Sequence, residues 1–230
     1  SRAALAFYQE IPWLDNLKQE TPNPVHLDDE QISRLYINSQ ITEWPRKSRT
    51  GCEPCDWWRC AIVIMVNYGQ RRSDWYNMRT NAVSFEKETV IFKAKKTGKR
   101  QILVLNPTVT WHLRKLNPEG REFIFSPSQT NKQLYREWHR IQSAAKVSDP
   151  EGMPFTFHSL RATAAMRYHE YFPGTAELLL GHALRRESQV TAKHYLGSAQ
   201  LKPLWNAIRN IPQPSAFLEA MEADTVKQTE

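Results

Sequence analysis

The sequence has few cysteines and no long apolar run, and both absences exclude classes of protein. Three cysteines occur in 230 residues, too few and of the wrong parity for the disulfide framework of a secreted domain. The longest apolar run, Ala61–Val66, is far shorter than the roughly 18 residues that a membrane-spanning helix needs. The first residues carry no signal-peptide pattern. We therefore expect a protein of the reducing cytoplasm with no membrane partner.

The three cysteines, Cys52, Cys55 and Cys60, follow a Cys-x-x-Cys-x4-Cys pattern. Structural zinc takes four protein ligands, and no histidine lies close enough in sequence to complete the set. We therefore expect no metal site, and we expect Cys60 to face the core of its helix. The sequence assigns no other role to these cysteines.

Acidic residues are fewer than basic residues. Lys and Arg together number 31 against 24 Asp and Glu, which gives a net charge of +7. A positive surface favours a polyanionic partner such as nucleic acid. Many soluble proteins are mildly basic, so the charge alone does not decide the function.

The residues with chemical potential gather between His158 and Tyr195. His158 and Arg161 are three residues apart, which places them on one face of a helix. His182 follows within Leu-Gly-His, and Tyr195 closes the stretch. Arginine holds phosphate oxygens in a planar fork, histidine transfers protons, and tyrosine can act as a nucleophile. This set predicts phosphoryl transfer on a phosphodiester, with Tyr195 as the attacking group.

The order of these motifs resembles the C-terminal signature of the tyrosine recombinases, the phage-integrase family. Upstream, Tyr68–Asp74 resembles the Gly-x-Arg-x-Ser-Glu box of that family, with Arg71 at its catalytic arginine and Asp74 in place of its usual glutamate. Lys95–Lys99 resembles the Lys-Thr-Gly hairpin tip, with Lys96 at the catalytic lysine. An ordered set of motifs is stronger evidence than any one motif. The resemblance extends over roughly residues 24 to 210.

The resemblance implies how the phosphate would be held. Arg71 and Arg161 would each bind non-bridging oxygens, and His182 would donate a further hydrogen bond to the same phosphate. Such preorganised positive donors stabilise the transition state of phosphoryl transfer. No metal and no other cofactor is then needed.

The resemblance also implies how protons would move. Lys96 would protonate the departing 5′ oxygen, and His158 would accept or relay the proton of Tyr195. Asp74 would orient the histidine and arginine side chains. The products would be a 3′-phosphotyrosyl bond and a free 5′ hydroxyl.

Some of these positions have rivals. Lys93, Lys95 and Lys99 lie close to Lys96, and the whole hairpin could be a solvated basic surface that touches DNA. Tyr168 and Tyr171 are alternatives to Tyr195, but they follow Arg161 too closely for the spacing of the family. The segment 183–188 also makes the interval between His182 and Tyr195 longer than in the commonest pattern.

Basic residues around the site are expected to bind DNA phosphates, which gives affinity with little sequence information. The expected partner is double-stranded DNA with specific recombination sites, and the resemblance implies a homotetramer on that DNA. The predicted DNA-binding residues are Arg72, Lys95, Lys99, Arg100, Arg185 and Arg186.

The chain divides into three parts. Residues 1–24 are predicted to be a leader and linker from a missing N-terminal core-binding domain, because Thr21–Pro24 breaks the chain and the protein starts without Met. Residues 25–211 form the predicted catalytic domain. Residues 212–230 form a tail in which Phe217, Leu218 and Met221 either dock on a neighbouring protomer or pack within the chain.

We predict an α+β fold that is mainly helical, with a small three-stranded antiparallel sheet on one side. Patterning and cap signals place the strands at 82–85, 89–96 and 100–105, with Lys96 at a hairpin tip. A helix from Trp57 to Tyr68, capped by Asp56, is apolar nearly all round and should be central. Further helices are expected at 28–37, 107–116, 131–147, 158–171, 174–180, 189–196 and 201–211.

The leading hypothesis is therefore a site-specific DNA recombinase or integrase. A type IB topoisomerase uses a similar set of residues, and a DNA-binding relative without catalysis would keep the fold. A generic basic helical domain that binds RNA or DNA predicts no covalent intermediate.

Overall fold

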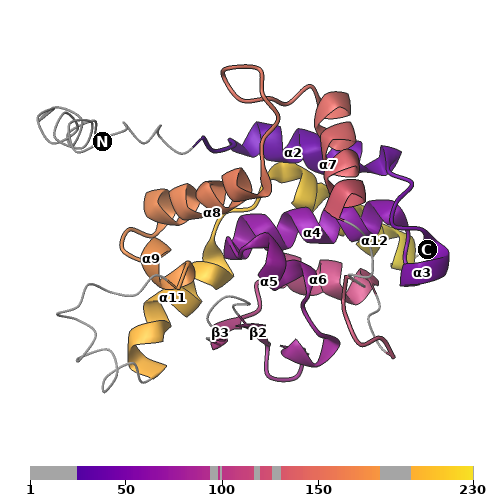
Figure 1. Ribbon diagram of the computed structural model, residues 1–230. Coiled ribbons are helices and arrows are strands. Elements are labelled where there is room, and N and C mark those ends of the chain that lie inside the picture. Colours follow the sequence, from indigo (N-terminus) through magenta and orange to yellow (C-terminus); the bar gives the residue numbers. More distant parts are fainter. Residues whose placement is uncertain are drawn as a thin grey trace, which may run out of the picture.

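The helices pack around a central helix, α4 (Pro54–Tyr68), in which every residue from Trp57 to Tyr68 except Arg59 is buried (Figure 1). The computed structural model describes residues 25–93, 98, 100–116, 120–125, 131–181 and 198–229. α4 begins at Pro54, earlier than predicted, because proline suits the first helical position. Asp56 therefore lies within the first turn and is not the N-cap. The central position predicted for this helix is confirmed.

The layer above α4 in Figure 1 begins with α2 (Asp29–Asn38). A capping box starts this helix: Asp28 accepts from the backbone N–H of Gln31, and Gln31 reaches back to the backbone N–H of Asp28. α2 packs against α7 (Asn131–Ala145). The short elements η1 (Ser39–Ile41) and α3 (Lys47–Thr50) connect α2 to α4.

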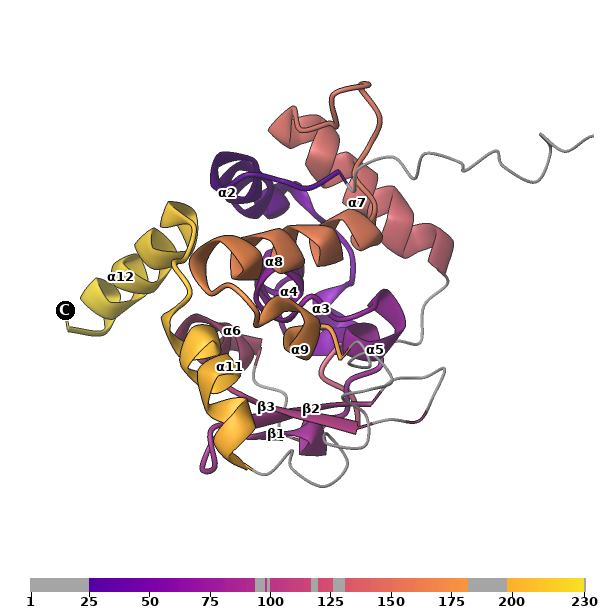
Figure 2. The same cartoon turned by 90° about the vertical axis from the view of Figure 1, so that its left-hand side faces the viewer.

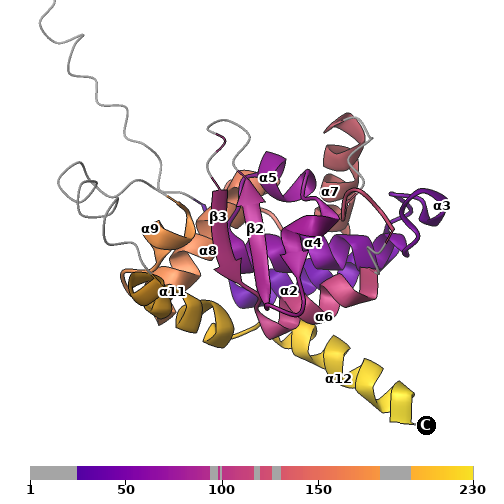
Figure 3. The same cartoon turned by 90° about the horizontal axis from the view of Figure 1, so that it is seen from below.

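A three-stranded antiparallel sheet lies on one side of the helical body, toward the viewer in Figure 3. Its strands, in spatial order, are β1 (Val83–Ser84), β2 (Thr89–Lys93) and β3 (Arg100–Val104). The ladder of β2 and β3 ends with Phe92 opposite Gln101 and Lys93 opposite Arg100. The predicted sheet is confirmed, while the predicted tip with Lys96 lies outside the described residues.

Asn106 joins the sheet to two helices. Its Oδ1 accepts from the backbone N–H of Thr108 at 2.9 Å and so caps α6 (Pro107–Leu116). Its Nδ2 donates to the carbonyl oxygen of Ile208 at 2.7 Å, in α11 (Ser198–Asn210). α11 runs beside β3 (Figure 2).

The helix that carries His158 and Arg161 is α8 (Phe157–Tyr171). Thr156 is its N-cap and accepts from the backbone N–H of Ser159 at 3.2 Å. Farther along α8, buried Arg167 pairs with Asp29 and donates to the carbonyl oxygen of Pro212. α8 is therefore tied to both α2 and the segment before the last helix. The short α9 (Ala176–Leu179) follows.

The C-terminal helix, α12 (Ser215–Thr229), occupies most of the segment that the sequence analysis describes only as a tail. Its Glu, Ala, Met and Lys residues favour a helix, which explains why this segment is helical. Phe217 is buried within the chain, with its ring 4.8 Å from Tyr36 and 6.2 Å from His112. Leu218 is 43% exposed.

The core is rich in tryptophan. Trp57, Trp58 and Trp138 are completely buried. Cys60 is buried too, and among the described residues no three His, Cys, Asp or Glu side chains lie together as a metal site would require. Nor is any described helix long and apolar enough to cross a membrane.

Candidate active site

Arg71 lies in the short connection between α4 and α5 (Arg72–Tyr76). Its carbonyl oxygen accepts from the backbone N–H groups of Asp74 at 2.8 Å and Trp75 at 3.3 Å. Arg71 is therefore the N-cap residue of α5, and its backbone is fixed between two helices. Its side chain is exposed and is available to an anionic ligand.

Gly69 ends α4 and brings that end against α8 and α9. Its φ is +56°, a left-handed conformation that favours glycine. A Cβ at this position would stand 2.9 Å from Ala164 Cβ and 2.9 Å from Leu180 Cδ2. Only glycine fits this contact without displacement of the helices around it.

Arg161 projects from α8 into this junction and is 6% exposed. Its Nη1 donates to the carbonyl oxygen of Gly69 at 2.6 Å, and its Nη2 donates to that of Leu180 at 3.0 Å. Burial and the charge of Arg71 lower the pKa of Arg161, while Asp74 raises it. A guanidinium stays charged in proteins despite such shifts. The result is a fixed positive charge beside a second, exposed arginine.

One cleft of about 280 Å³ brings three of the predicted catalytic residues together: Arg71, Arg161 and His158. His158 is exposed on the first turn of α8. Tyr135 and Phe157, whose ring centroids are 5.2 Å apart, line the same cleft. These residues come from segments far apart in the chain, so the cleft exists only in the folded protein.

Asp74 lies in the first turn of α5 and is 6% exposed. It accepts a hydrogen bond from the Ser73 hydroxyl at 2.8 Å. Its charge favours the charged form of Arg161. Both contacts suit a carboxylate that holds neighbouring groups in place.

A second cleft, of about 600 Å³, adjoins the first through Ser73 and lies beside the β2–β3 hairpin. Lys93 and Arg100, opposite each other at the end of the ladder, line it together with Asp74. Arg100 is exposed, as a predicted DNA-binding residue should be. Arg72 is half-buried, and its guanidinium carbon lies 5.9 Å from the centroid of the Tyr135 ring.

Several predicted site residues lie outside the described residues. These are Lys95, Lys96, Lys99, His182, Arg185, Arg186 and Tyr195. Their assignments remain predictions from the sequence. His182 directly follows Gly181, which is described.

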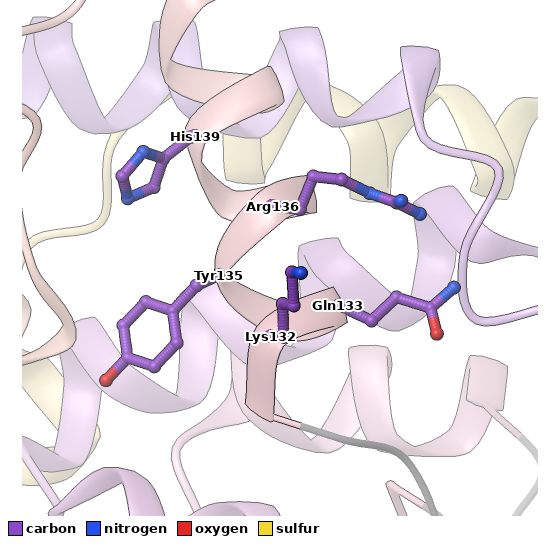
Figure 4. A pocket seen from close by; sticks show the side chains of 5 residues that line it. All are labelled: Lys132, Gln133, Tyr135, Arg136 and His139. Carbon is purple, nitrogen blue, oxygen red and sulfur yellow. The ribbon is translucent and has the colours of Figure 1, made fainter.

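The sequence analysis missed the polar face of α7. Lys132, Gln133, Tyr135, Arg136 and His139 line a cleft of about 600 Å³. In Figure 4, Tyr135 and His139 project to one side of the helix, while Gln133 and Arg136 project to the other. Tyr135 also lines the cleft of Arg71 and Arg161, so this residue borders both clefts. The helical spacing of residues 132, 136 and 139 is the sequence signal for this face.

A family model described as the phage integrase family matches residues 26–200. Among solved structures, the lambda integrase catalytic core is 24% identical with a TM-score of 0.54, over 69% of this chain and 95% of that one. XerA recombinase is 16% identical with a TM-score of 0.55, over 81% of this chain and 66% of that one. A lambda integrase tetramer bound to a Holliday junction is 23% identical with a TM-score of 0.53, over 70% and 48%. The chain thus spans two thirds or less of these longer neighbours. No curated protein sequence gives a significant match.

Proposed function

The chain belongs to the phage integrase family, and on that premise we propose that it is a site-specific recombinase that cleaves and rejoins DNA through a 3′-phosphotyrosyl intermediate. One observation carries the proposal. Arg71, His158 and Arg161, which the motifs single out from two distant segments, line a single cleft. What supports the proposal is that these three residues were singled out by their motifs and then share one cleft.

The two arginines would bind the phosphate in different ways. Arg161 is held by the carbonyl oxygens of Gly69 and Leu180, so its charge is in place before DNA arrives. Arg71 is exposed and can close on the non-bridging oxygens after DNA binds. Preorganised donors are the most effective way to stabilise the charge that develops in the transition state.

In the proposed reaction the Tyr195 hydroxyl attacks the scissile phosphorus. A bond forms between the tyrosine oxygen and phosphorus, and the bond from phosphorus to the 5′ oxygen breaks. His158 takes the proton of Tyr195, while Lys96 gives a proton to the departing 5′ oxygen. His182 donates a hydrogen bond to the phosphate. The phosphotyrosyl bond keeps the energy of the broken linkage, so the 5′ hydroxyl of another strand can reverse the step without ATP.

The proposed partner is double-stranded DNA with specific recombination sites, in the cytoplasm. In this proposal the exposed Arg100 and the basic face of α7, formed by Lys132, Arg136 and His139, bind phosphates near the scissile one; both line clefts that share a residue with the cleft of Arg71 and Arg161. We further propose a homotetramer on DNA, because the similar lambda integrase structure is a tetramer on a Holliday junction.

Covalent trapping tests this proposal. The protein is incubated with nicked suicide substrates that carry candidate recombination sites, and denaturing gels reveal the protein–DNA adduct. We expect an adduct with the wild type and none with Tyr195→Phe. Tyr171→Phe is the matched control, because Tyr171 is 41% exposed at the end of α8, whereas Tyr168 is fully buried and cannot reach DNA.

Each other result changes the assignment. An adduct that survives Tyr195→Phe contradicts the nucleophile and points to Tyr171. If every duplex gives the same adduct yield whatever its sequence, the protein cleaves DNA without site specificity, as a type IB topoisomerase would. Tight DNA binding without any adduct supports a relative that has lost catalysis.

A further inference from the structure

The turn at the end of α9 is held by side chains from other elements. Gln101 of β3 donates from its Nε2 to the carbonyl oxygens of Leu178 at 2.8 Å and Leu179 at 3.0 Å. Arg161 of α8 donates to the next carbonyl, that of Leu180, at 3.0 Å. The last carbonyls of a helix have no partner within it. Here a strand and a second helix supply those partners.

A second amide completes the arrangement around Gln101. Gln70 is buried between Gly69 and Arg71, and its Nε2 donates to the Oε1 of Gln101 at 3.3 Å and to the carbonyl oxygen of Tyr68 at 3.2 Å. Because carbonyls only accept, the amino group of Gln101 must face α9 and its oxygen must face Gln70. We call Gln70 and Gln101 the amide clamp.

The clamp also limits the space for a side chain at Gly181, the residue after Leu180. Gly181 has a φ of +64°, and a Cβ there would lie 3.4 Å from the Oε1 of Gln101. α9 spans only Ala176–Leu179, and so short a helix cannot hold its own shape in water. Contacts from outside must therefore set the place of the Leu180 carbonyl.

We propose that Gln101 is a positioning residue that fixes the turn at Leu178–Leu180 and, through the Leu180 carbonyl, orients the guanidinium of Arg161 on the scissile phosphate. This inference rests on the proposed function. Gln101 sits opposite Phe92, one position before the end of the β2–β3 ladder. The sheet is thus connected to the buried arginine through hydrogen bonds to a single turn.

The test uses two variants of Gln101. Gln101→Leu removes the N–H donors and keeps a side chain of similar size. Gln101→Glu keeps the shape of the side chain but places a carboxylate oxygen against two carbonyl oxygens. Ile102→Thr is the matched control, because Ile102 is the next residue of β3 and is 51% exposed. All variants are measured in single-turnover cleavage of the suicide substrate, with thermal melting and DNA affinity recorded alongside. We expect both Gln101 variants to cleave roughly 10- to 100-fold more slowly, and Ile102→Thr to match the wild type.

A second substrate separates positioning from loss of structure. A methylphosphonate at the scissile position replaces one non-bridging oxygen with a neutral methyl group, which removes the negative charge that Arg161 would neutralise. The loss caused by Gln101→Leu should then shrink to a few-fold, in parallel with the loss caused by Arg161→Ala. The inference would be overturned if Gln101→Leu lowered the cleavage rate equally on the phosphodiester and the methylphosphonate. It would also be overturned if Gln101→Leu lowered neither rate. If the wild type forms no adduct on any substrate, the proposed function fails, independently of the clamp.

Discussion

At the scale of single residues, Gly69 sets how closely the end of α4 approaches α8 and the turn at Leu180. Its carbonyl oxygen accepts from Arg161, and its missing side chain leaves room for Ala164 and Leu180. A residue with a side chain would force those neighbours away and take the carbonyl with them. Under the proposed function Arg161 binds the scissile phosphate, and small displacements of such a group have large effects on the rate.

We therefore predict that Gly69→Ala lowers the free energy of unfolding by roughly 2–4 kcal/mol, because it adds left-handed backbone strain and overpacking. We also expect the cleavage rate to fall by more than the loss of folded protein accounts for. The matched control is Gly51→Ala. Gly51 has a φ of +71°, but no atom lies within 4 Å of the place that a Cβ would take, so only strain of about 1–2 kcal/mol applies. Urea denaturation measures both. If both variants lost the same free energy of unfolding, the close contact at Gly69 would be contradicted.

His112 is expected to make the free energy of unfolding depend on pH. Its Nδ1 donates to the carbonyl oxygen of Thr108 at 2.8 Å, so its Nε2 accepts from the Tyr36 hydroxyl, also at 2.8 Å. Burial lowers the pKa of His112 from 6.5 to about 4; the Thr108 contact raises it, and the charges of Arg59 and Lys115 lower it. The unfolded chain therefore takes up this proton at a higher pH than the folded one.

We predict that this group contributes its full stability above pH 6.5 and loses it as the pH falls toward about 4, by about 1.4 kcal/mol per pH unit within that window. The difference in urea midpoint between the wild type and His112→Gln should narrow from pH 7 to pH 5. Other groups titrate in both proteins and cancel. A constant difference would show that His112 does not titrate with a lowered pKa.

At the scale of elements, α12 is anchored by one aromatic side chain. Phe217 is fully buried against Tyr36 of α2 and His112 of α6. Truncation of a buried phenylalanine costs roughly 3–5 kcal/mol, so we predict that loss for Phe217→Ala. Leu218→Ala, at 43% exposure, should change stability by less than about 0.5 kcal/mol.

Protein concentration provides a further readout for α12. Phe217 packs within its own chain, so its contribution should be independent of concentration in urea or thermal melts. A loss that grows as the protein is concentrated would instead mean that Phe217 docks between protomers, as the sequence left open.

At the scale of the whole molecule, the net charge of +7 predicts salt-sensitive binding to DNA. The basic face of α7 offers a specific test. Lys132 has no carboxylate partner among the described residues, while Arg140, on the same helix, pairs with Glu43 at 3.2 Å and Glu137 at 3.6 Å. We predict that Lys132→Ala lowers the slope of log Kd against log salt by about 1.

Arg140→Ala is the control, since a residue already neutralised by two carboxylates should change that slope far less. Fluorescence anisotropy over a salt series measures both variants. If Arg140→Ala has the larger effect, the ion pairs open on DNA and the assignment of the binding face must change.

The sequence alone was enough for much of this description. Alternation of apolar residues placed β2 and β3, and the capping pattern of Asp28 and Gln31 placed the start of α2, because these signals act between near neighbours. The motifs also singled out Arg71, His158 and Arg161, which line one cleft, while their catalytic roles stay predictions. Local patterns failed at α12, because the polar residues after Met221 suggested a tail, whereas their helix propensity continues the helix to Thr229.

The grouping of those residues came from tertiary contacts. Nothing near Arg161 in the chain predicts that Gly69 and Leu180 hold its guanidinium, that Gln101 secures the turn beside it, or that Tyr135 forms a wall of the same cleft. Each contact joins elements that pack together only after the core around α4 has formed. The chemistry of the site is thus written in residue types and their order, whereas its geometry depends on long-range packing that no local pattern encodes.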